Sequence, residues 1–373
     1  MSKKKICFVA QFPPPIHGLS KAVETLYNSA LNSEANPNGE FEFEKVDITN
    51  NKVFLKNLVK ISKSKADLFY FTISQTKGGN LRDLVIFKLL ELQHKKCLIH
   101  LHGGYYRQLV DNDMADWQRK ANYRAINKLE GIIVLSQSLR NSFDGMIEKE
   151  KVYVVDNCID REYMASDKSM ELKLELLKTK KVLHVLWLSN FIQSKGYLIV
   201  IELAKLEKKR IDAGEEQRFV FDFAGAFFDD DEKINFIENI KRNRLEKICV
   251  YHGVAEGFQK RRLLEESDIF ILPTRYPKEG QPISILEALG NGLYVITTDH
   301  AGIPDIIEDR VNGMVLKKNF ELPNIYQKML ELCNQDYYGV AVNNRRYCVK
   351  RFVQERYIEG MKRCFETASK GRN

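Results

Sequence analysis

The sequence predicts an α/β protein with two doubly wound parallel-sheet domains, on the strength of three observations. The chain has 373 residues, more than one ordinary hydrophobic core organises and enough for two domains. Short runs rich in Val, Ile and Phe alternate with segments of helical spacing, as in parallel strands covered by helices on both faces. There are eleven such runs, which are more than one open sheet comfortably holds.

The expected strands fall into two sets with helices between them. Segments such as Leu81–Gln93 and Leu198–Arg210 carry helical spacing, which indicates right-handed βαβ units. The first set comprises Ile6–Ala10, Phe41–Val46, Leu68–Thr72, Cys97–His102, Gly131–Ser136 and Val152–Val155. The second comprises Val182–Leu188, Phe219–Ala224, Ile248–His252, Ile269–Pro273 and Tyr294–Thr298.

A polar, Lys/Glu-rich stretch separates the two sets. Because Ala165–Lys181 carries no strand signal, we expect one domain over residues 1–170 and a second over 171–342. An amphipathic helix is expected from Asn343 to about Lys370, within a terminal segment 343–373. Its pattern leaves open whether it packs locally or returns to the first domain.

Composition and targeting signals limit the class of protein. The chain is 44% hydrophobic and 29% charged, which excludes a disordered or fibrous protein. The apolar run Ile6–Ala10 is shorter than a signal-peptide core, and no stretch approaches the roughly 20 apolar residues of a membrane span. Seven scattered cysteines without a Cys-x-x-Cys pair argue against disulfides or a zinc site. We therefore expect a cytoplasmic protein.

The net charge of +8 comes mainly from the first half, where residues 1–180 contain 28 Lys or Arg against 22 Asp or Glu. Such an excess suits nucleic acid, an anionic bilayer or a polyphosphate ligand. Five lysines accompany an apolar set in one expected helix, a pattern that fits either an anionic membrane surface or a solvated helix. The lysines are Lys52, Lys56, Lys60, Lys63 and Lys65, and the apolar residues are Phe54, Leu55, Leu58 and Val59.

The segment from Asp268 to Gly313 is the richest in candidate site residues. The expected strand ends at Pro273-Thr274, and a loop with Glu279 and Gly280 leads to a helix from Ile283. In an open α/β sheet, ligands bind outside the carboxyl ends of strands, where helix N-termini offer free N–H groups. Two carboxylates there, Glu279 and Glu287, would each accept hydroxyls of a sugar nucleotide. The alternative is that Glu287 is a solvated helix residue.

This segment resembles the donor site of the retaining family-four glycosyltransferases of bacterial surface-polysaccharide synthesis. Their signature Glu-x7-Glu stands here as Glu279-Gly-Gln-Pro-Ile-Ser-Ile-Leu-Glu287, and Gly302-Ile-Pro-Asp305 with Asn312-Gly313 matches its continuation. The resemblance implies the GT-B fold, two Rossmann-like domains facing each other across a cleft. It also implies that Glu279 orients the donor sugar and that Glu287 holds the ribose. The diphosphate and sugar would meet the backbone around Gly280, Gln281, Pro282, Ile283 and Ser284.

Lys195 follows the expected strand Val182–Leu188 and is placed to meet the diphosphate, where an ammonium group balances charge on the leaving group. The segment resembles the family's Gly-Arg…Lys-Gly element, but Ser189-Asn190 stands where Gly-Arg is usual. Asn190 therefore occupies the position of a donor-binding arginine, and Arg275 is a candidate substitute.

The turn after the first strand, Pro13 to Ser20, is not the dinucleotide-binding Gly-x-Gly-x-x-Gly. A glycine at a helix start still lets backbone N–H groups meet phosphate. The resemblance assigns Gly18 to the donor site from the first domain. His17 is a candidate on the acceptor side, with a structural role equally open.

Two histidines end the strand that leads into Gly103-Gly104. His100 and His102 point the same way on a strand, so a metal pair or a buried strand histidine are the alternatives. The resemblance favours His102 as the histidine at the reaction centre, with Tyr105, Tyr106 and Arg107 shaping the acceptor side. It also places the nucleotide base near Gly225 and Val254.

Taken with the resemblance, these residues predict a retaining, metal-independent hexosyltransferase. It would use a nucleotide diphosphate sugar, with UDP favoured, and no other cofactor. The acceptor would be a hydroxyl of a saccharide or lipid-linked saccharide, with the inner face of the cell membrane as an alternative location. Three alternatives stay open: a sugar-nucleotide epimerase or a phosphorylase of similar fold, and a non-catalytic nucleotide-sugar-binding protein. A nucleic-acid binder lacks a recognition motif.

Overall fold

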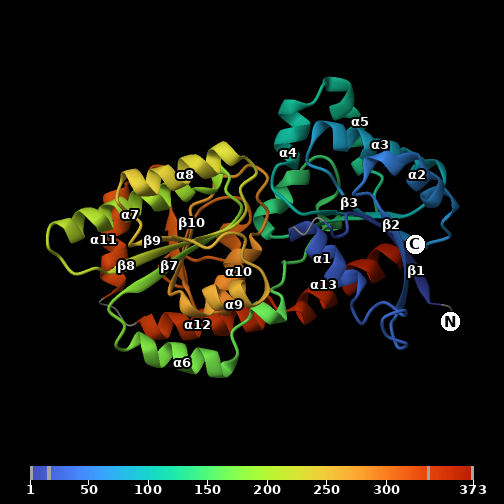
Figure 1. The fold of residues 1–373 in the computed structure, drawn as a ribbon. Coiled ribbons are helices and arrows are strands. Elements are labelled where there is room, and N and C mark those ends of the chain that lie inside the picture. The colour runs from blue at the N-terminus through green and yellow to red at the C-terminus, as the bar shows by residue number, and fades with distance from the viewer. Residues whose placement is uncertain (1–2, 15–17, 334–336, 371–373) are drawn as a thin grey trace. The chain divides into compact units, whose positions relative to one another are not determined.

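The computed structural model describes residues 3–14, 18–333 and 337–370, and the chain forms two compact units (Figure 1). The first unit comprises Met1–Cys158, Lys278–Gln281 and Gln354–Asn373, and the second comprises Ile159–Pro277 and Pro282–Val353. Each unit is built on one parallel six-stranded sheet. The predicted fold class, two doubly wound α/β sheets, is confirmed.

The first sheet has the order β2-β1-β3-β4-β5-β6. Ile6 at the centre pairs with Phe43 on one side and with Leu68 on the other, all in parallel register. The strands are β1 (Lys4–Ala10), β2 (Phe41–Asp47), β3 (Leu68–Thr72), β4 (Cys97–Leu101), β5 (Gly131–Val134) and β6 (Val152–Val154).

The helices of the first unit cover both faces of its sheet. The connections β2–β3, β3–β4 and β4–β5 all advance in one direction, so right-handed crossovers put their helices on one face. These are α2 (Phe54–Lys63), α3 (Lys77–Leu92) and α5 (Asp116–Ile126). The opposite face carries α1 (Gly18–Tyr27) and α13 (Gln354–Lys370), where the Tyr357 hydroxyl donates to the Ala22 carbonyl.

Shorter helical segments complete the first unit. They are η1 (Asn51–Val53), α4 (Tyr106–Gln108), η2 (Leu109–Asp113), η3 (Gln137–Phe143) and η4 (Lys149–Lys151). Among the helices that the structure describes, none combines the length and hydropathy needed to cross a bilayer.

The second sheet has the order β12-β11-β10-β7-β8-β9. The short edge strand β12 was not expected from the sequence; it begins at Gly313 and pairs with β11 alone. The strands are β7 (Leu183–Leu188), β8 (Phe219–Ala224), β9 (Cys249–Tyr251), β10 (Ile269–Leu272), β11 (Tyr294–Thr298) and β12 (Gly313–Leu316).

Two groups of helices enclose the second sheet (Figure 1). One face carries α7 (Tyr197–Asp212), α8 (Asp230–Arg242) and α11 (Leu322–Leu332). The other carries α6 (Asp167–Leu177), α9 (Gly257–Glu266), α10 (Ile283–Gly290) and α12 (Tyr337–Arg351). The short turns η5 (Arg161–Tyr163), η6 (Gln193–Lys195) and η7 (Ile303–Asp305) complete this unit.

The terminal helix expected from Asn343 to Lys370 is two helices. Its first part is α12 of the second unit and its second part is α13 of the first unit. The break falls at Phe352, whose side chain is fully buried and whose carbonyl accepts the Ile159 N–H at 2.8 Å. That carbonyl serves a long-range contact instead of continuing the helix.

The polar stretch expected to be a domain boundary is largely helix α6 of the second unit. The chain passes from the first unit to the second after Cys158, before the expected boundary at residue 170. On α6, Met170 and Lys173 are buried. The Lys173 ammonium donates to the Asn291 carbonyl at 2.8 Å and to the Leu264 carbonyl at 3.4 Å.

Lys173 should make the stability of the second unit depend on pH. Burial lowers its pKa to about 7, against 10.5 in an exposed lysine. The unfolded chain therefore binds one more proton between these values, and the free energy of unfolding should rise with pH by at most about 1.4 kcal/mol per unit. Urea unfolding of a Trp117→Phe variant, followed by the fluorescence of buried Trp187, measures this.

In the same background, Lys173→Met should flatten the dependence between pH 7 and 10. An unchanged slope would show that Lys173 does not cause it.

Candidate active site

The loops that follow the parallel strands of the second sheet all lie at its carboxyl edge. Strand order runs outward from β7 through β8 to β9, and then from β10 through β11 to β12 on the other side. The order therefore reverses between β7 and β10, the point at which open α/β sheets bind ligands. The loops that follow these two strands carry Lys195 and Arg275.

Lys195 and Arg275 are held side by side by backbone contacts. The Arg275 N–H donates to the Ser194 carbonyl at 2.6 Å. The Lys195 ammonium lies 5.2 Å from the centroid of the Tyr276 ring. The two loops that carry these cationic residues are therefore in contact at the switch point of the sheet.

The guanidinium of Arg275 has one clear partner. Its Nη1 donates to Asp299 Oδ1 at 2.7 Å, while its Nη2 is buried without a hydrogen-bond partner in the described part of the chain. Asn190, which stands where the resemblance places an arginine, is exposed. The assignment of Arg275 as the substitute cation stays a prediction.

Helix α10 begins at Ile283, shortly after Arg275 in the chain. Pro282 is its N-cap residue and, within the described ranges, no side chain caps this end. Ile283 and Ser284 form the first turn and are partly exposed. Their N–H groups lie at the positive end of the helix dipole, an arrangement suited to an anion.

Glu287 lies within α10 and is 2% exposed, so it is not a solvated helix residue. Its Oε1 is 2.7 Å from the ammonium of Lys260 on α9, and that ammonium lies 4.1 Å from the Tyr163 ring centroid. Burial raises the pKa of Glu287, while Lys260 acts in the opposite direction. Sequence reasoning missed Lys260 and Tyr163, because neither belongs to a motif.

The loops after β7, β8 and β9 touch one another through glycines. Gly225 has φ of 150°, and a Cβ there would lie 1.7 Å from the Ser189 carbonyl oxygen. The Gly225 N–H donates to the Gly253 carbonyl at 2.8 Å, and Val254 beside it is 57% exposed. The structure thus brings the two expected base-binding turns together.

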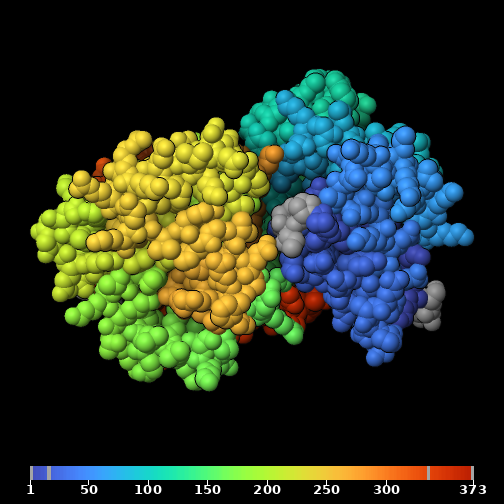
Figure 2. Space-filling view, viewed as in Figure 1, coloured from blue at the N-terminus to red at the C-terminus, as the bar shows by residue number. Residues whose placement is uncertain are grey.

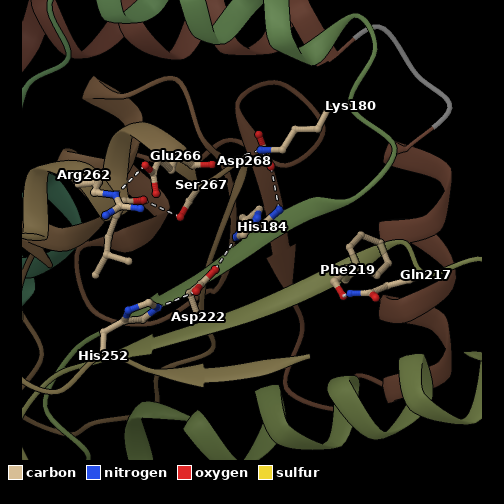
Figure 3. A network of polar contacts seen from close by, with 11 residues as sticks. Lys180, His184, Gln217, Phe219, Asp222, His252, Arg262, Glu266, Ser267 and Asp268 are labelled. Carbon is tan, nitrogen blue, oxygen red and sulfur yellow. Dashed lines mark hydrogen bonds and ion pairs between the residues drawn. The ribbon is translucent and has the colours of Figure 1, made fainter. Parts of the chain in front are cut away.

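A polar network lies beneath these turns (Figure 3). Asp222 on β8 accepts hydrogen bonds from His184 at 2.8 Å and His252 at 2.7 Å. Burial alone would raise the pKa of Asp222, but the bonds from both histidines bring it below the usual value. The network continues through Asp268, which contacts the His184 N–H and Lys180, and it fixes β7, β8 and β9.

The loop Lys278–Gln281 belongs to the first unit, and a close backbone contact holds it there. A Cβ at Gly280 would lie 2.6 Å from the His102 carbonyl oxygen and 3.0 Å from Gly103 Cα. No other residue fits there without displacing this backbone. Glu279, 7% exposed, is therefore held next to the turn that carries His102.

Gln281 fixes the same loop through its side chain. Its Nε2 donates to Asp156 Oδ1 at 2.7 Å, and its Oε1 accepts the Asn157 N–H at 2.6 Å. Its carbonyl accepts from Asn157 Nδ2 at 2.9 Å. Both polar atoms of the Gln281 side chain are thus hydrogen-bonded within the protein. Sequence reasoning did not find its partners Asp156 and Asn157.

His102 rests on a buried histidine. The ring centroids of His100 and His102 are 3.8 Å apart, and His100 Nδ1 shares a hydrogen bond of 2.7 Å with the Tyr70 hydroxyl. Burial, and then the neighbouring His102, hold the pKa of His100 well below its usual value. His100 is therefore a neutral, buried support for His102.

The expected acceptor residues separate into different environments. Tyr106 is fully buried and its hydroxyl donates to Asn122 at 2.7 Å, so its assignment to an acceptor surface was wrong. As the first residue of α4, it turns its side chain into the core. Tyr105 donates to Asp113 at 2.6 Å, and Arg107 contacts Asp111 at 3.0 Å. Both are partly exposed.

Gly18 begins helix α1, at the loop that follows β1. The order of the first sheet reverses between β1 and β3, so Gly18 lies at that sheet's own switch point. His17 lies outside the described residues. Within the described ranges, no group of three His, Cys, Asp or Glu residues is placed to hold a metal ion.

Comparison with known proteins finds a family to which most of the second unit is similar. Residues 170–351 match the family model "Glycosyl transferases group 1". This segment is therefore similar to group 1 glycosyltransferases. It contains Lys195, Arg275, Glu279 and Glu287.

Two relatives by sequence cover 73% of this chain. The amylovoran biosynthesis glycosyltransferase AmsK of Erwinia amylovora is 28% identical over 284 residues, and the match covers 63% of that protein. The poly(ribitol-phosphate) alpha-N-acetylglucosaminyltransferase of Staphylococcus aureus is 23% identical over 278 residues, with 51% of it covered. The match thus spans less than two thirds of either relative.

The fold is similar to that of Anabaena Alr3699/HepE, solved in complex with UDP. The TM-score is 0.74 at 16% identity, covering 98% of this chain and all of the other. The same protein in complex with UDP-glucose gives a TM-score of 0.70. These similarities show the fold, the two-domain GT-B architecture.

Removing Lys260 should expose the cost of burying Glu287. Lys260→Met leaves a buried carboxylate without its cation, and we expect a loss of about 3 kcal/mol in the free energy of unfolding at pH 8. Glu287→Gln in the same chain should recover most of it. Urea unfolding measures the four members of this double-mutant cycle.

The matched control is Lys205→Met, which removes an exposed ion pair of the same 2.7 Å length to Glu202. It should cost less than about 1 kcal/mol. If both Lys variants lose the same amount, the Lys260–Glu287 pair has no special role in stability.

Proposed function

We propose that this chain is a retaining hexosyltransferase acting in cell-surface polysaccharide synthesis. It moves a sugar from a nucleotide diphosphate donor, UDP favoured, to a hydroxyl of a saccharide or lipid-linked saccharide. The observation that carries the proposal is the pairing of Lys195 and Arg275 at the switch point of the second sheet. The uncapped N-terminus of α10 follows in the same segment of chain.

This arrangement suits a diphosphate. Two cations balance the charge that builds on the leaving group, and the α10 amides donate to its oxygens. Arg275 already binds one carboxylate, that of Asp299, while its buried Nη2 is left to donate. Asn190 is uncharged and stands where the resemblance places an arginine. Lys195 and Arg275 together supply the positive charge that Asn190 lacks.

In the proposal, the two carboxylates divide the rest of the donor. Glu279 accepts hydroxyls of the sugar, and Glu287 accepts those of the ribose. The ion pair with Lys260 favours the charged, acceptor-only form of Glu287 despite its burial. Gly225 and Val254 provide the turns against which the base lies.

The reaction breaks the bond between the anomeric carbon and the β-phosphate oxygen. The acceptor oxygen bonds to the same carbon from the same face, its proton passes to the departing phosphate, and the nucleoside diphosphate is released. Proximity of the reactants and stabilisation of the leaving group supply the rate enhancement. No metal takes part. His102 contacts the reacting sugar, and we assign acceptor binding to the first unit and donor binding to the second.

The comparisons support this choice of chemistry and substrates. The structural neighbour was solved with UDP and with UDP-glucose. One relative is named as an alpha-N-acetylglucosaminyltransferase and another as an amylovoran biosynthesis enzyme. A nucleoside diphosphate sugar, a polymer or saccharide acceptor and an α-linked product agree with these names.

Two substitutions test the site. Glu279→Ala should abolish sugar transfer, and Lys195→Met should lower kcat by about 100-fold, because a diphosphate contact that strengthens in the transition state is lost. Product formation is measured with a panel of nucleotide sugars, chosen beforehand by the thermal stabilisation that each gives. Lys318→Met, which removes an exposed lysine of the same unit, is the matched control.

The same assay separates the competing functions. A transferase releases UDP only with acceptor present and gives a product of unchanged anomeric configuration by NMR. Donor turnover without acceptor would instead establish an epimerase, and tight binding without turnover a binding protein. Near-normal activity of Glu279→Ala would refute the donor-site assignment.

A further inference from the structure

The positive charge of the chain is concentrated in the segment that forms α2, α3 and α5. Residues 51–128 contain fifteen Lys or Arg and six Asp or Glu, a net charge of +9 that exceeds the +8 of the whole chain. One of the six acids, Asp83, is fully buried beside Arg82. The rest of the protein is close to neutral, so this charge marks one region of the first unit.

The same three helices expose large apolar side chains. Leu55 on α2 is 77% exposed, Leu92 on α3 67%, and Trp117 on α5 62%. Single exposed apolar residues are ordinary, but here they recur at helical spacing among cations. The basic-apolar face consists of Leu55, Val59, Leu81, Val85, Leu92 and Trp117 with Lys52, Lys56, Lys60, Lys63, Lys77, Lys88, Lys120 and Arg124.

These side chains lie on the outer side of one helical layer. α2 packs beside α3 and α3 beside α5, all on the same face of the first sheet (Figure 1). The inner sides of the helices are buried, for example at Ile61, Phe87 and Ile126. In Figure 2, the lighter blue to teal surface of the first unit belongs to this part of the chain, and the darker blue surface to residues before it.

We propose that the basic-apolar face binds the surface of an anionic lipid bilayer. A polyanion such as nucleic acid would use the cations but would gain nothing from Leu55, Leu92 or Trp117. A bilayer interface uses both, because apolar side chains enter the acyl boundary while lysines meet anionic headgroups. Attachment is peripheral: within the described residues, no helix is able to span the bilayer.

The position of this face has a consequence for the proposed function, on which this step rests. α2, α3 and α5 follow strands β2, β3 and β4, so each begins at the carboxyl edge of the first sheet. Leu55 and Trp117 therefore lie toward the edge at which His102 follows β4. A bilayer bound to this face would supply a lipid-linked acceptor from that side.

Trp117 allows a direct test. The chain has two tryptophans, and Trp187 is fully buried. Vesicles of phosphatidylcholine with phosphatidylglycerol should bind the protein in flotation, and brominated lipids should quench Trp117. Phosphatidylcholine alone should bind at least about tenfold more weakly, as should the anionic vesicles in high salt.

Two double variants separate charge from insertion. Lys56→Gln/Lys60→Gln should lower vesicle affinity about tenfold, and Leu55→Ser/Val59→Ser should abolish the quenching of Trp117. Matched controls on the second unit remove the same groups elsewhere. These are Lys317→Gln/Lys318→Gln, and Leu172→Ser/Leu176→Ser, an exposed apolar pair with the same spacing on α6.

The proposal would be overturned if the protein did not bind the anionic vesicles. It would also be overturned if the protein bound them without quenching of Trp117 and the Leu55→Ser/Val59→Ser variant bound equally well. The second result would identify a surface for soluble polyanions. Transfer to a water-soluble acceptor should be normal in all four double variants. A failure of the membrane proposal is thereby distinguished from a failure of the proposed transferase.

Discussion

The reversal of strand order between β7 and β10 is the constraint on which the candidate donor site depends. It separates the helices that follow these strands onto opposite faces of the sheet, and it leaves their connecting loops side by side at one edge. Lys195 reaches that edge from one loop and Arg275 from the other. The strand order alone places both loops at this edge, whatever sequence motif each loop contains.

The two carboxylates are both buried, but they are held by different contacts. Glu287 is placed inside the unit and is balanced by Lys260 and the Tyr163 ring. Glu279 is held instead by the backbone contact between Gly280 and His102. Glu287 therefore occupies a helix position whose charge is balanced, while Glu279, eight residues earlier, occupies a loop position that packing fixes. Two acidic residues of one motif are stabilised by unrelated means.

The sequence was sufficient for elements whose signal is local. Continuous apolar runs located eleven strands, and the segments after β7 and β10 were correctly expected to be loops that carry Lys195 and Glu279. Long-range partners carry no such signal: Lys260, Asp156 and Asn157 meet their partners only after folding. Tyr105 and Tyr106 are adjacent and alike in sequence, yet Tyr105 is the N-cap of α4 with a partly exposed ring, while Tyr106 is its first residue with a buried one. The break at Phe352 depends on Ile159 and was equally invisible.

Helix α13 shares a core with strands that are translated long before it. It supplies Tyr357, Met361, Cys364, Phe365 and Ala368 to the core that contains Phe8 and Tyr70 of the first unit. During synthesis, the ribosome releases these residues after every strand of both sheets. The first unit, although translated first, therefore completes its core only after the second unit has emerged. A chain terminated before residue 354 would retain every strand of both sheets and still expose the apolar side of β1 and β3.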